Sequence, residues 1–238
     1  YPEFDPSQAE ECRREVEALH ARGIAAMVPL NCTIWETAWY MRSMEEMMVG
    51  MMTDDPLTER HFERITVLAE QRAAAFASCG ADLLHLGDDI GMQQTIMMSH
   101  ELYRKHLKPR LARVVQAAKA AKPDMVITYH SCGYVTPFIT DLMEAGVEVL
   151  NPVQPECMDF AEIHAEYGKK LSFWGTVGTQ STMPFGTPDE VKAVVRRNLE
   201  IAGEAGGLLC TPTHLLEPEV PWENIEAYVE ACREFRLA

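Results

Sequence analysis

The sequence predicts an α/β fold built on a parallel sheet, a (β/α)8 barrel of the TIM type. Short runs of nearly continuous apolar residues alternate along the chain with longer segments of helical periodicity. Strands that are buried on both faces, as in a parallel sheet, carry such apolar runs. Repeated strand–helix units place the helices outside the sheet. The chain shows six strand candidates, so a closed eight-stranded barrel would lack two strands.

The strands are expected at 24–30, 82–89, 125–133, 147–153, 170–178 and 207–214. Long helices are expected at 6–22, 57–78, 99–121 and 188–204, with shorter ones at 134–145, 159–167 and 222–235. The helix at 188 follows Thr187, a capping residue, and begins with Pro188, which favours the first helical position.

An open, doubly wound sheet is the main alternative fold. Its usual dinucleotide fingerprint, GxGxxG opening a helix after the first strand, is absent from the sequence. No linker or internal repeat divides the chain, so we expect one domain spanning residues 1–238. A chain of this length can bury one sizeable core.

The net charge limits the possible partners. The formal net charge is −15, and no run of lysine or arginine offsets it. Both nucleic acid and an anionic membrane surface would repel such a chain. No apolar stretch approaches the ~20 residues of a membrane span.

The cysteines indicate a reducing compartment. There are seven, odd in number and scattered, in a chain long enough to fold without disulfides. A cytoplasmic enzyme is therefore expected. The polar N-terminus has no signal-peptide pattern, and the absence of an initiating methionine suggests a processed or partial chain.

Polar residues gather where the predicted strands end. In a parallel barrel these ends share one face, on which active sites form. The candidates there for binding a small-molecule substrate are Asn151, Gln154, Thr176 and Gln180.

The segment His130-Ser-Cys132 predicts a metal site. A His and a Cys two residues apart on an extended segment point to the same side. Imidazole and thiolate both bind Zn²⁺, and three protein ligands with one open position are typical of catalytic zinc. The neighbouring strand end offers His214 or Cys210 as the third ligand. Alternatively, His130 and Cys132 simply end a strand, with the His hydrogen-bonded and the Cys packed.

Asp88 and Asp89 form a second candidate pair and are predicted to be catalytic. Two carboxylates at a barrel mouth can repel each other, raise one pKa and act as acid or base. Strand alternation predicts that only one of them faces the pocket, with Asp89 on the same side as His85 and Gly87. The other could cap the following helix.

The stretch 35–52 is rich in aromatic residues and methionine. We expect Trp35, Trp39 and Tyr40 in a loop after the first strand. With the methionines between Met41 and Met52 they would suit core packing, a dimer contact or a lid over a planar cofactor.

Several sequence blocks together resemble the uroporphyrinogen decarboxylase superfamily. They are GDDIGMQ, HSCGYV, EAGVEVLNPVQ, LSFWGTVGTQSTMPFGTP and CTPTHLLEPEVPWENI, and the resemblance extends over nearly the whole chain. It implies a (β/α)8 barrel whose third to eighth strands are present. The superfamily holds decarboxylases that act on a tetrapyrrole and methyltransferases that work with corrinoid proteins.

The methyltransferase branch is the closer resemblance. It implies zinc held by His130 and Cys132, with His214 in the place of a distant cysteine. Asp89 and Gln154 would orient the substrate, and the partners would be a small methylated molecule or a corrinoid protein, with a homodimer as the expected assembly.

Two alternatives remain. A metal-free carboxy-lyase acting on a tetrapyrrole needs cationic groups for several carboxylates, and the strand ends carry almost none. A non-catalytic barrel that binds a corrinoid or a partner is the other.

Overall fold

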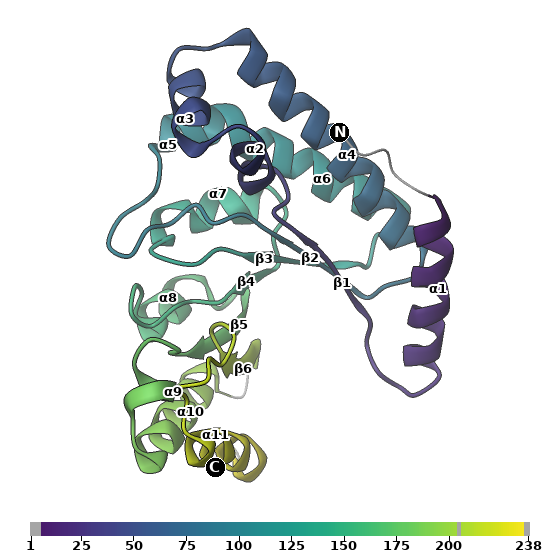
Figure 1. The fold of residues 1–238 in the computed structure, drawn as a ribbon. Helices are drawn as coiled ribbons and strands as arrows, with labels where there is room; N and C mark the ends of the chain where they lie inside the picture. Colours follow the sequence, from purple (N-terminus) through teal and green to yellow (C-terminus); the bar gives the residue numbers. More distant parts are fainter. Residues whose placement is uncertain (1–5, 204–205, 236–238) are drawn as a thin grey trace. The chain divides into compact units, whose positions relative to one another are not determined.

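The computed structural model describes residues 6–203 and 206–235. The chain divides into two compact units (Figure 1). The first contains the residues up to 89 together with 98–130 and 138–148. The second contains 90–97, 131–137 and the residues from 149 onwards. Within the part of the chain that is described, no helix has the length and apolar character needed to cross a bilayer.

Six parallel strands follow one another in the sheet in sequence order, from β1 to β6. They are β1 (Met27–Asn31), β2 (Leu83–Gly87), β3 (Val126–His130), β4 (Val149–Asn151), β5 (Ser172–Val177) and β6 (Leu208–Pro212). Every predicted strand is present. A doubly wound sheet reverses its strand order at a switch point. The sequential order seen here instead matches part of a (β/α)8 barrel.

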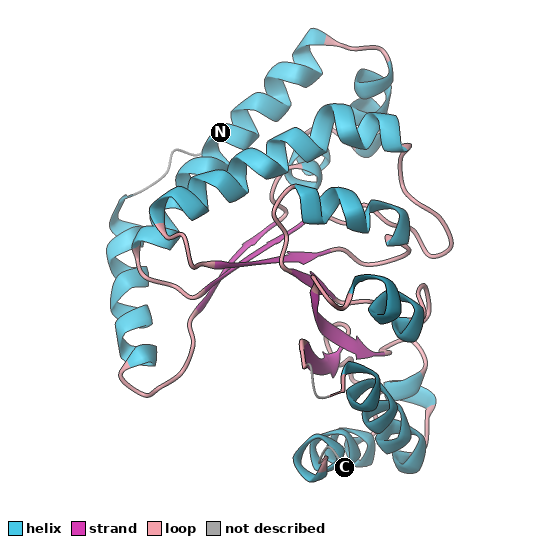
Figure 2. Ribbon diagram, turned by 180° about the vertical axis from the view of Figure 1, so that it is seen from behind, coloured by secondary structure: helices cyan, strands magenta, loops and turns pink. Residues whose placement is uncertain are grey.

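Helices flank the strands of the first unit (Figure 2). They are α1 (Pro6–His20), α2 (Trp35–Met41), α3 (Met44–Met52), α4 (Pro56–Ser78), α5 (His100–Leu102), α6 (Lys108–Ala121) and α7 (Ile139–Glu144). A π-helical turn, Tyr103–Leu107, joins α5 to α6.

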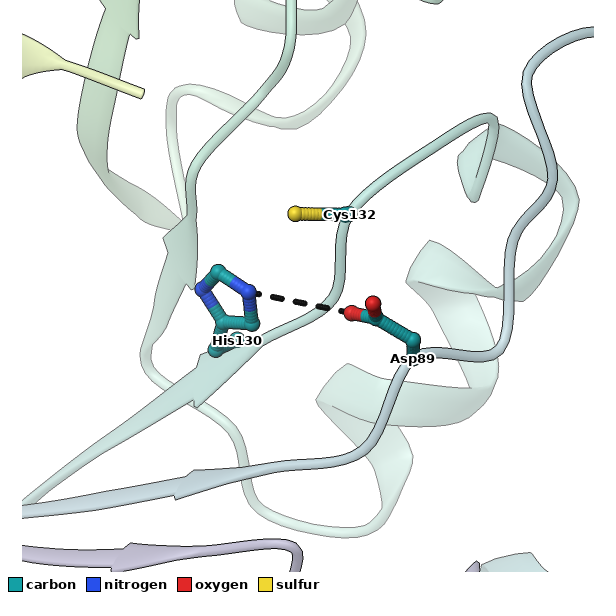
Figure 3. A group of neighbouring side chains, drawn as sticks. All are labelled: Asp89, His130 and Cys132. Atoms are coloured by element: carbon teal, nitrogen blue, oxygen red, sulfur yellow. Dashed lines mark ion pairs between the residues drawn. The ribbon is translucent and has the colours of Figure 1, made fainter. Parts of the chain in front are cut away.

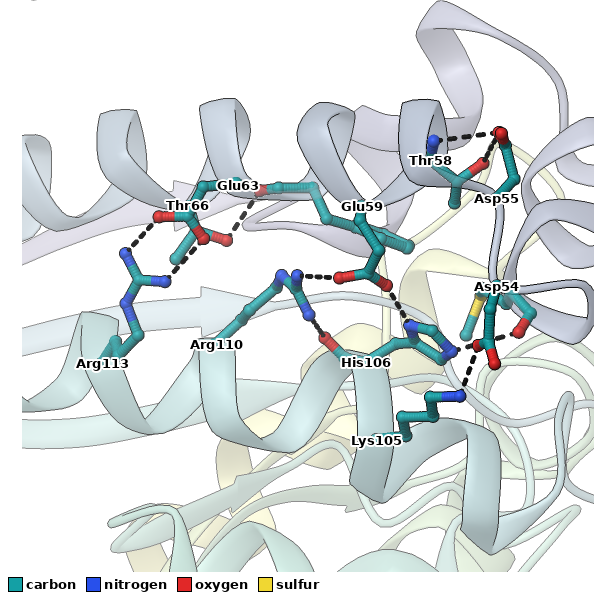
Figure 4. Close-up of polar contacts among 12 residues, drawn as sticks. Asp54, Asp55, Thr58, Glu59, Glu63, Thr66, Lys105, His106, Arg110 and Arg113 are labelled. Carbon is teal, nitrogen blue, oxygen red and sulfur yellow. Dashed lines mark hydrogen bonds and ion pairs between the residues drawn. The ribbon is translucent and has the colours of Figure 1, made fainter.

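Polar contacts tie α4 to the π-helical turn and α6 (Figure 4). The Glu59 carboxylate shares a hydrogen bond of 2.6 Å with Nδ1 of His106 and accepts one of 2.7 Å from Arg110. The other ring nitrogen of His106 lies 3.2 Å from the carbonyl oxygen of Met51. Buried His106 thus joins α3, α4 and α6 in one network.

The second unit carries α8 (Phe160–Tyr167), α9 (Thr182–Phe185), α10 (Pro188–Ala202) and α11 (Trp222–Glu234). The predicted cap of α10 is present as a capping box, in which Thr187 and Glu190 satisfy each other's backbone N–H groups. The core of this unit is formed by Val177, Met183, Val191, Val195, Cys210, Ala227 and Ala231.

The expectation of a loop over residues 35–40 is wrong, because residues 35–41 and 44–52 form α2 and α3. Met47 and Met51 are buried in the core, whereas Met41 and Met52 are exposed. The stretch is therefore an amphipathic helix pair, and its methionines serve mainly in packing.

Candidate active site

The ends of β2 and β3 bring a carboxylate and an imidazole together (Figure 3). His130 is the last residue of β3 and pairs in register with Gly87, the last residue of β2. Asp89 follows two residues later. Its Oδ1 atom lies 3.7 Å from Nε2 of His130, and both side chains are partly exposed. A ligand can therefore reach this pair.

A second histidine lies behind the first. His85 precedes Gly87 on the same face of β2, and its ring meets that of His130 edge-on at 6.1 Å. Nδ1 of His85 shares a 2.6 Å hydrogen bond with the hydroxyl of Thr128. Burial, followed by the nearby charge of His130, lowers the pKa of His85 to about 4. The imidazole of His85 is therefore neutral at physiological pH, and it packs against the ring of His130.

Cys132 adds a third potential metal ligand. A carboxylate oxygen of Asp89, a ring nitrogen of His130 and the sulfur of Cys132 lie within 4.8 Å of one another (Figure 3). Carboxylate, imidazole and thiolate are all zinc ligands. No other such group of three occurs among residues 6–203 and 206–235. The donor chemistry therefore fits a zinc ion.

Asp88 occupies a different environment from its neighbour. Its buried carboxylate accepts hydrogen bonds of 2.9 to 3.1 Å from the backbone N–H groups of Ile34 and Glu36, at the start of α2. Burial raises the pKa of Asp88 to about 7, against the opposing effect of these donors. Asp88 therefore caps the start of α2.

Glu36 belongs to the same cluster as Asp89 and was not anticipated from the sequence. One carboxylate oxygen of Glu36 accepts a 3.2 Å hydrogen bond from the backbone N–H of Asp89, and the other lies 3.4 Å from the Tyr40 hydroxyl. Burial, and then the charge of Asp89, raise the pKa of Glu36. A loop at 35–40 gave no reason to place Glu36 beside Asp89. In the structure Glu36 lies in the first turn of α2, and its side chain contacts Asp89.

The second unit contains a cavity of about 550 Å³. Predicted residues that line it are Cys132, Gln154, Gln180 and His214. The Gln154 side chain accepts a 3.0 Å hydrogen bond from the backbone N–H of Gly133. Gln180 accepts one of 3.1 Å from Gln93. These two glutamines therefore form part of the cavity wall.

Asn151 and Thr176 lie elsewhere. Asn151 is buried, and its side-chain amide donates to the carbonyl oxygen of Trp174 at 2.9 Å. The buried hydroxyl of Thr176 accepts a 3.1 Å hydrogen bond from Asn198 of α10. Thr176 has a positive φ of 78°, so the regular strand alternation is broken there. Both side chains link structural elements, and neither lines the cavity.

Cys210 and His214, the two candidates for a third zinc ligand, lie in different environments. Cys210 is buried in the core against α10 and α11, and burial raises its thiol pKa to about 12. A thiol that resists ionisation in an apolar core is a poor ligand. His214 follows β6 and lines the same cavity as Cys132. Neither His214 nor Cys210 belongs to the group formed by Asp89, His130 and Cys132.

The six strand-to-helix loops contain acidic residues but no basic ones. Not one of the segments 32–34, 88–99, 131–135, 152–159, 178–181 and 213–221 contains a lysine or arginine. They contain the acidic residues Asp88, Asp89, Glu156, Asp159, Glu217 and Glu219. Lysines and an arginine instead occur in helix-to-strand loops, for example Arg22, Lys122 and Lys169. The strand ends are thus acidic without local cationic compensation.

The uroporphyrinogen decarboxylase family matches residues 26–235 of the chain. The chain belongs to this family. Asp89, His130 and Cys132 lie at or just after the ends of β2 and β3, and in (β/α)8 barrels active sites form at the strand ends.

Known relatives include enzymes of both expected kinds. A methylated-thiol–coenzyme M methyltransferase of Methanosarcina mazei is 24% identical over 217 residues, which cover 89% of this chain and 54% of that protein. A uroporphyrinogen decarboxylase of Pelodictyon phaeoclathratiforme is 26% identical over 160 residues, which cover 65% of this chain and 42% of that protein. The chain thus spans about half the length of the curated relatives that it matches.

Among solved structures, a methyltransferase from Methanosarcina mazei superposes with a TM-score of 0.75 at 23% identity. The match covers 95% of this chain and 63% of that one. It supports the barrel-type fold.

Proposed function

We propose that this family member is a methyltransferase that works with zinc and a methylated small molecule or a methyl-corrinoid protein. The observation that carries the proposal is the group of Asp89, His130 and Cys132. Its three ligand atoms lie within 4.8 Å of one another. The similarity to a methylated-thiol–coenzyme M methyltransferase supports the same class of reaction.

In this proposal His130 and Cys132 hold the metal, with Asp89 or His214 as the third ligand. When bound, zinc would hold a substrate thiol as its thiolate, which is a strong nucleophile at neutral pH. Glu36 fixes the backbone N–H of Asp89 and so positions its carboxylate. His85 packs against the His130 ring and limits its rotation. Gln154 and Gln180 form the cavity wall and would orient the substrate.

A tetrapyrrole decarboxylase is the second candidate, because relatives with that activity match the chain. Its substrate carries several carboxylates, which proteins bind with arginine or lysine. The absence of both residues from all six strand-to-helix loops counts against this function.

Metal content tests the proposal directly. Protein purified without added metal should contain about one zinc per chain by plasma emission spectroscopy, and Cys132→Ala should lose it. Cys157→Ala is the matched control, since Cys157 is partly buried in a strand-to-helix loop outside the ligand group. It should retain zinc. Well-folded wild-type protein that binds no zinc, even when zinc is supplied, would overturn the proposal.

Methyl transfer is the second measurement. Transfer from methylcobalamin to a thiol should produce the thioether in wild type and not in Cys132→Ala. Separate Asp89→Ala and His214→Ala variants identify the third ligand by loss of zinc.

A further inference from the structure

The cavity of the second unit has a wall whose polar groups largely satisfy one another. Gln93 donates to Gln180, and the Thr179 and Thr213 hydroxyls lie 3.1 Å apart. The Gln154 carbonyl is already engaged by a backbone N–H group. Selection between ligands therefore depends on the remaining side chains. These are the apolar Met92, Phe185 and Leu215, the carboxylates Glu217 and Glu219, and the potential metal ligands Cys132 and His214.

Two glutamates contribute negative charge to the cavity wall. Glu217 and Glu219 line the cavity and are exposed. Neither forms an ion pair or a side-chain hydrogen bond among residues 6–203 and 206–235. Their carboxylates are thus available to a ligand.

Among the described residues that line the cavity there is no lysine or arginine. Three basic side chains on α10 form ion pairs with acidic residues outside the cavity. The pairs are Lys192 with Glu230, Arg196 with Glu234 and Arg197 with Asp159. In the metal-free cavity an anionic ligand would lose its hydration beside two carboxylates and gain no lysine or arginine as a partner, which is unfavourable.

The apolar side chains suit a methylated cation. Phe185 lines the cavity with 78% of its surface exposed, and Met92 and Leu215 are also exposed there. An aromatic ring attracts a quaternary ammonium or sulfonium group through its negatively polarised face. Carboxylates nearby add to the attraction without needing a hydrogen-bond donor on the ligand.

We propose that this cavity selects a methylated onium cation, such as a quaternary ammonium compound, over an anionic thiol or thioether. That the cation is a methyl donor rests on the function proposed above, whereas the charge selectivity of the cavity does not. The similar methyltransferase is named for a methylated thiol and coenzyme M, whereas the inference predicts a methylated cation for this cavity.

Calorimetric titration with three probes tests the inference. They are choline, its neutral isostere 3,3-dimethyl-1-butanol, and the anion 2-(methylthio)ethanesulfonate. Choline should bind at least about tenfold more tightly than the isostere, since a cation beside an aromatic ring and carboxylates gains about 1.4 kcal/mol or more. The anion should bind most weakly. Equal affinity for choline and the isostere, tighter binding of the anion, or no binding of choline at millimolar concentration would each overturn the inference.

Variants locate the effect. The double variant Glu217→Gln, Glu219→Gln should weaken choline binding about tenfold and leave the isostere unchanged. Phe185→Leu should also weaken choline selectively. Glu223→Gln is the matched control, because Glu223 is exposed at the start of α11 but does not line the cavity.

The zinc and methyl-transfer assays keep the two proposals separate. Choline selectivity in protein that binds no zinc would support the cavity inference and overturn the proposed function. Zinc-dependent methyl transfer without choline selectivity would support the proposed function and overturn the cavity inference.

Discussion

A Cβ atom placed on Gly87 would lie 2.8 Å from the Cβ atom of His130 and 2.7 Å from its carbonyl oxygen. These distances are closer than real Cβ contacts. Gly87 and His130 are register partners on β2 and β3, so the missing side chain at one position leaves room for the imidazole at the other.

Gly87→Ala should therefore displace His130. We expect zinc affinity to fall at least tenfold, and the free energy of unfolding to fall by about 1–3 kcal/mol because of overpacking. Zinc titration and urea unfolding measure the two effects. Gly23→Ala is the control for zinc binding, since a Cβ atom there meets nothing within 4 Å, although its φ of 70° strains an alanine in a way that Gly87 does not share. Unchanged zinc affinity in Gly87→Ala would contradict the assignment of His130 as a ligand.

The two adjacent aspartates should respond differently to the same substitution. Asp88→Asn replaces one of the two carboxylate oxygens that accept backbone N–H groups at the start of α2 with an amide donor, which should cost about 1–3 kcal/mol of unfolding free energy. Its zinc content should stay normal. Asp89→Asn should leave stability nearly unchanged and weaken zinc binding. Urea unfolding and metal analysis of both variants check this, and the reverse pattern would contradict it.

Much of this arrangement follows from strand periodicity. Alternation along β2 places Gly87 and Asp89 on one side, and two-residue spacing pairs His130 with Cys132. These short-range patterns were enough to predict the strands and the potential ligands His130 and Cys132.

The remaining features depend on contacts that no local pattern encodes. Glu36 points at Asp89 because α2 begins early, and α2 begins there because Asp88, more than fifty residues away, caps it. Thr176 leaves the regular alternation through its positive φ. Cys210 faces the helices and not the cavity because of packing in the second unit.

Glu36→Gln tests the contribution of the negative charge of that residue. The amide oxygen can still accept the N–H of Asp89, so the fold should be unchanged, but one negative charge beside the ligand group is lost. We expect zinc affinity to fall about three- to tenfold, in line with the loss of about 1 kcal/mol of attraction between partly exposed charges.

Glu36→Ala also removes the hydrogen bond and should weaken zinc binding further. Glu45→Gln, an exposed glutamate in the first turn of α3, is the control and should bind zinc like wild type. A control that lost as much affinity as Glu36→Gln would show a general charge effect and no specific role.

The lowered pKa of Asp141 should make the free energy of unfolding of the first unit depend on pH. Burial opposes ionisation of its side chain, but hydrogen bonds from Lys108 (2.7 Å) and Arg104 (2.9 Å) outweigh this and lower the pKa of Asp141 below 3.8. The folded state therefore releases this proton more readily than the unfolded state does. The resulting stabilisation is complete above pH 3.8 and is lost as the pH falls through the lower folded-state pKa.

Asp141→Asn should consequently lower the free energy of unfolding by about 2 kcal/mol near neutral pH, because it removes hydrogen bonds to a charged acceptor. The difference from wild type should shrink as the pH falls below 3.8, where Asp141 of the unfolded wild-type chain takes up a proton, until the lower folded-state pKa is passed. Urea unfolding from pH 7 to pH 3 measures this. Glu166→Gln, at an exposed position on α8, should show little difference at any pH. A difference for Asp141→Asn that stayed constant down to pH 3 would mean that its contacts stabilise the fold independently of its charge.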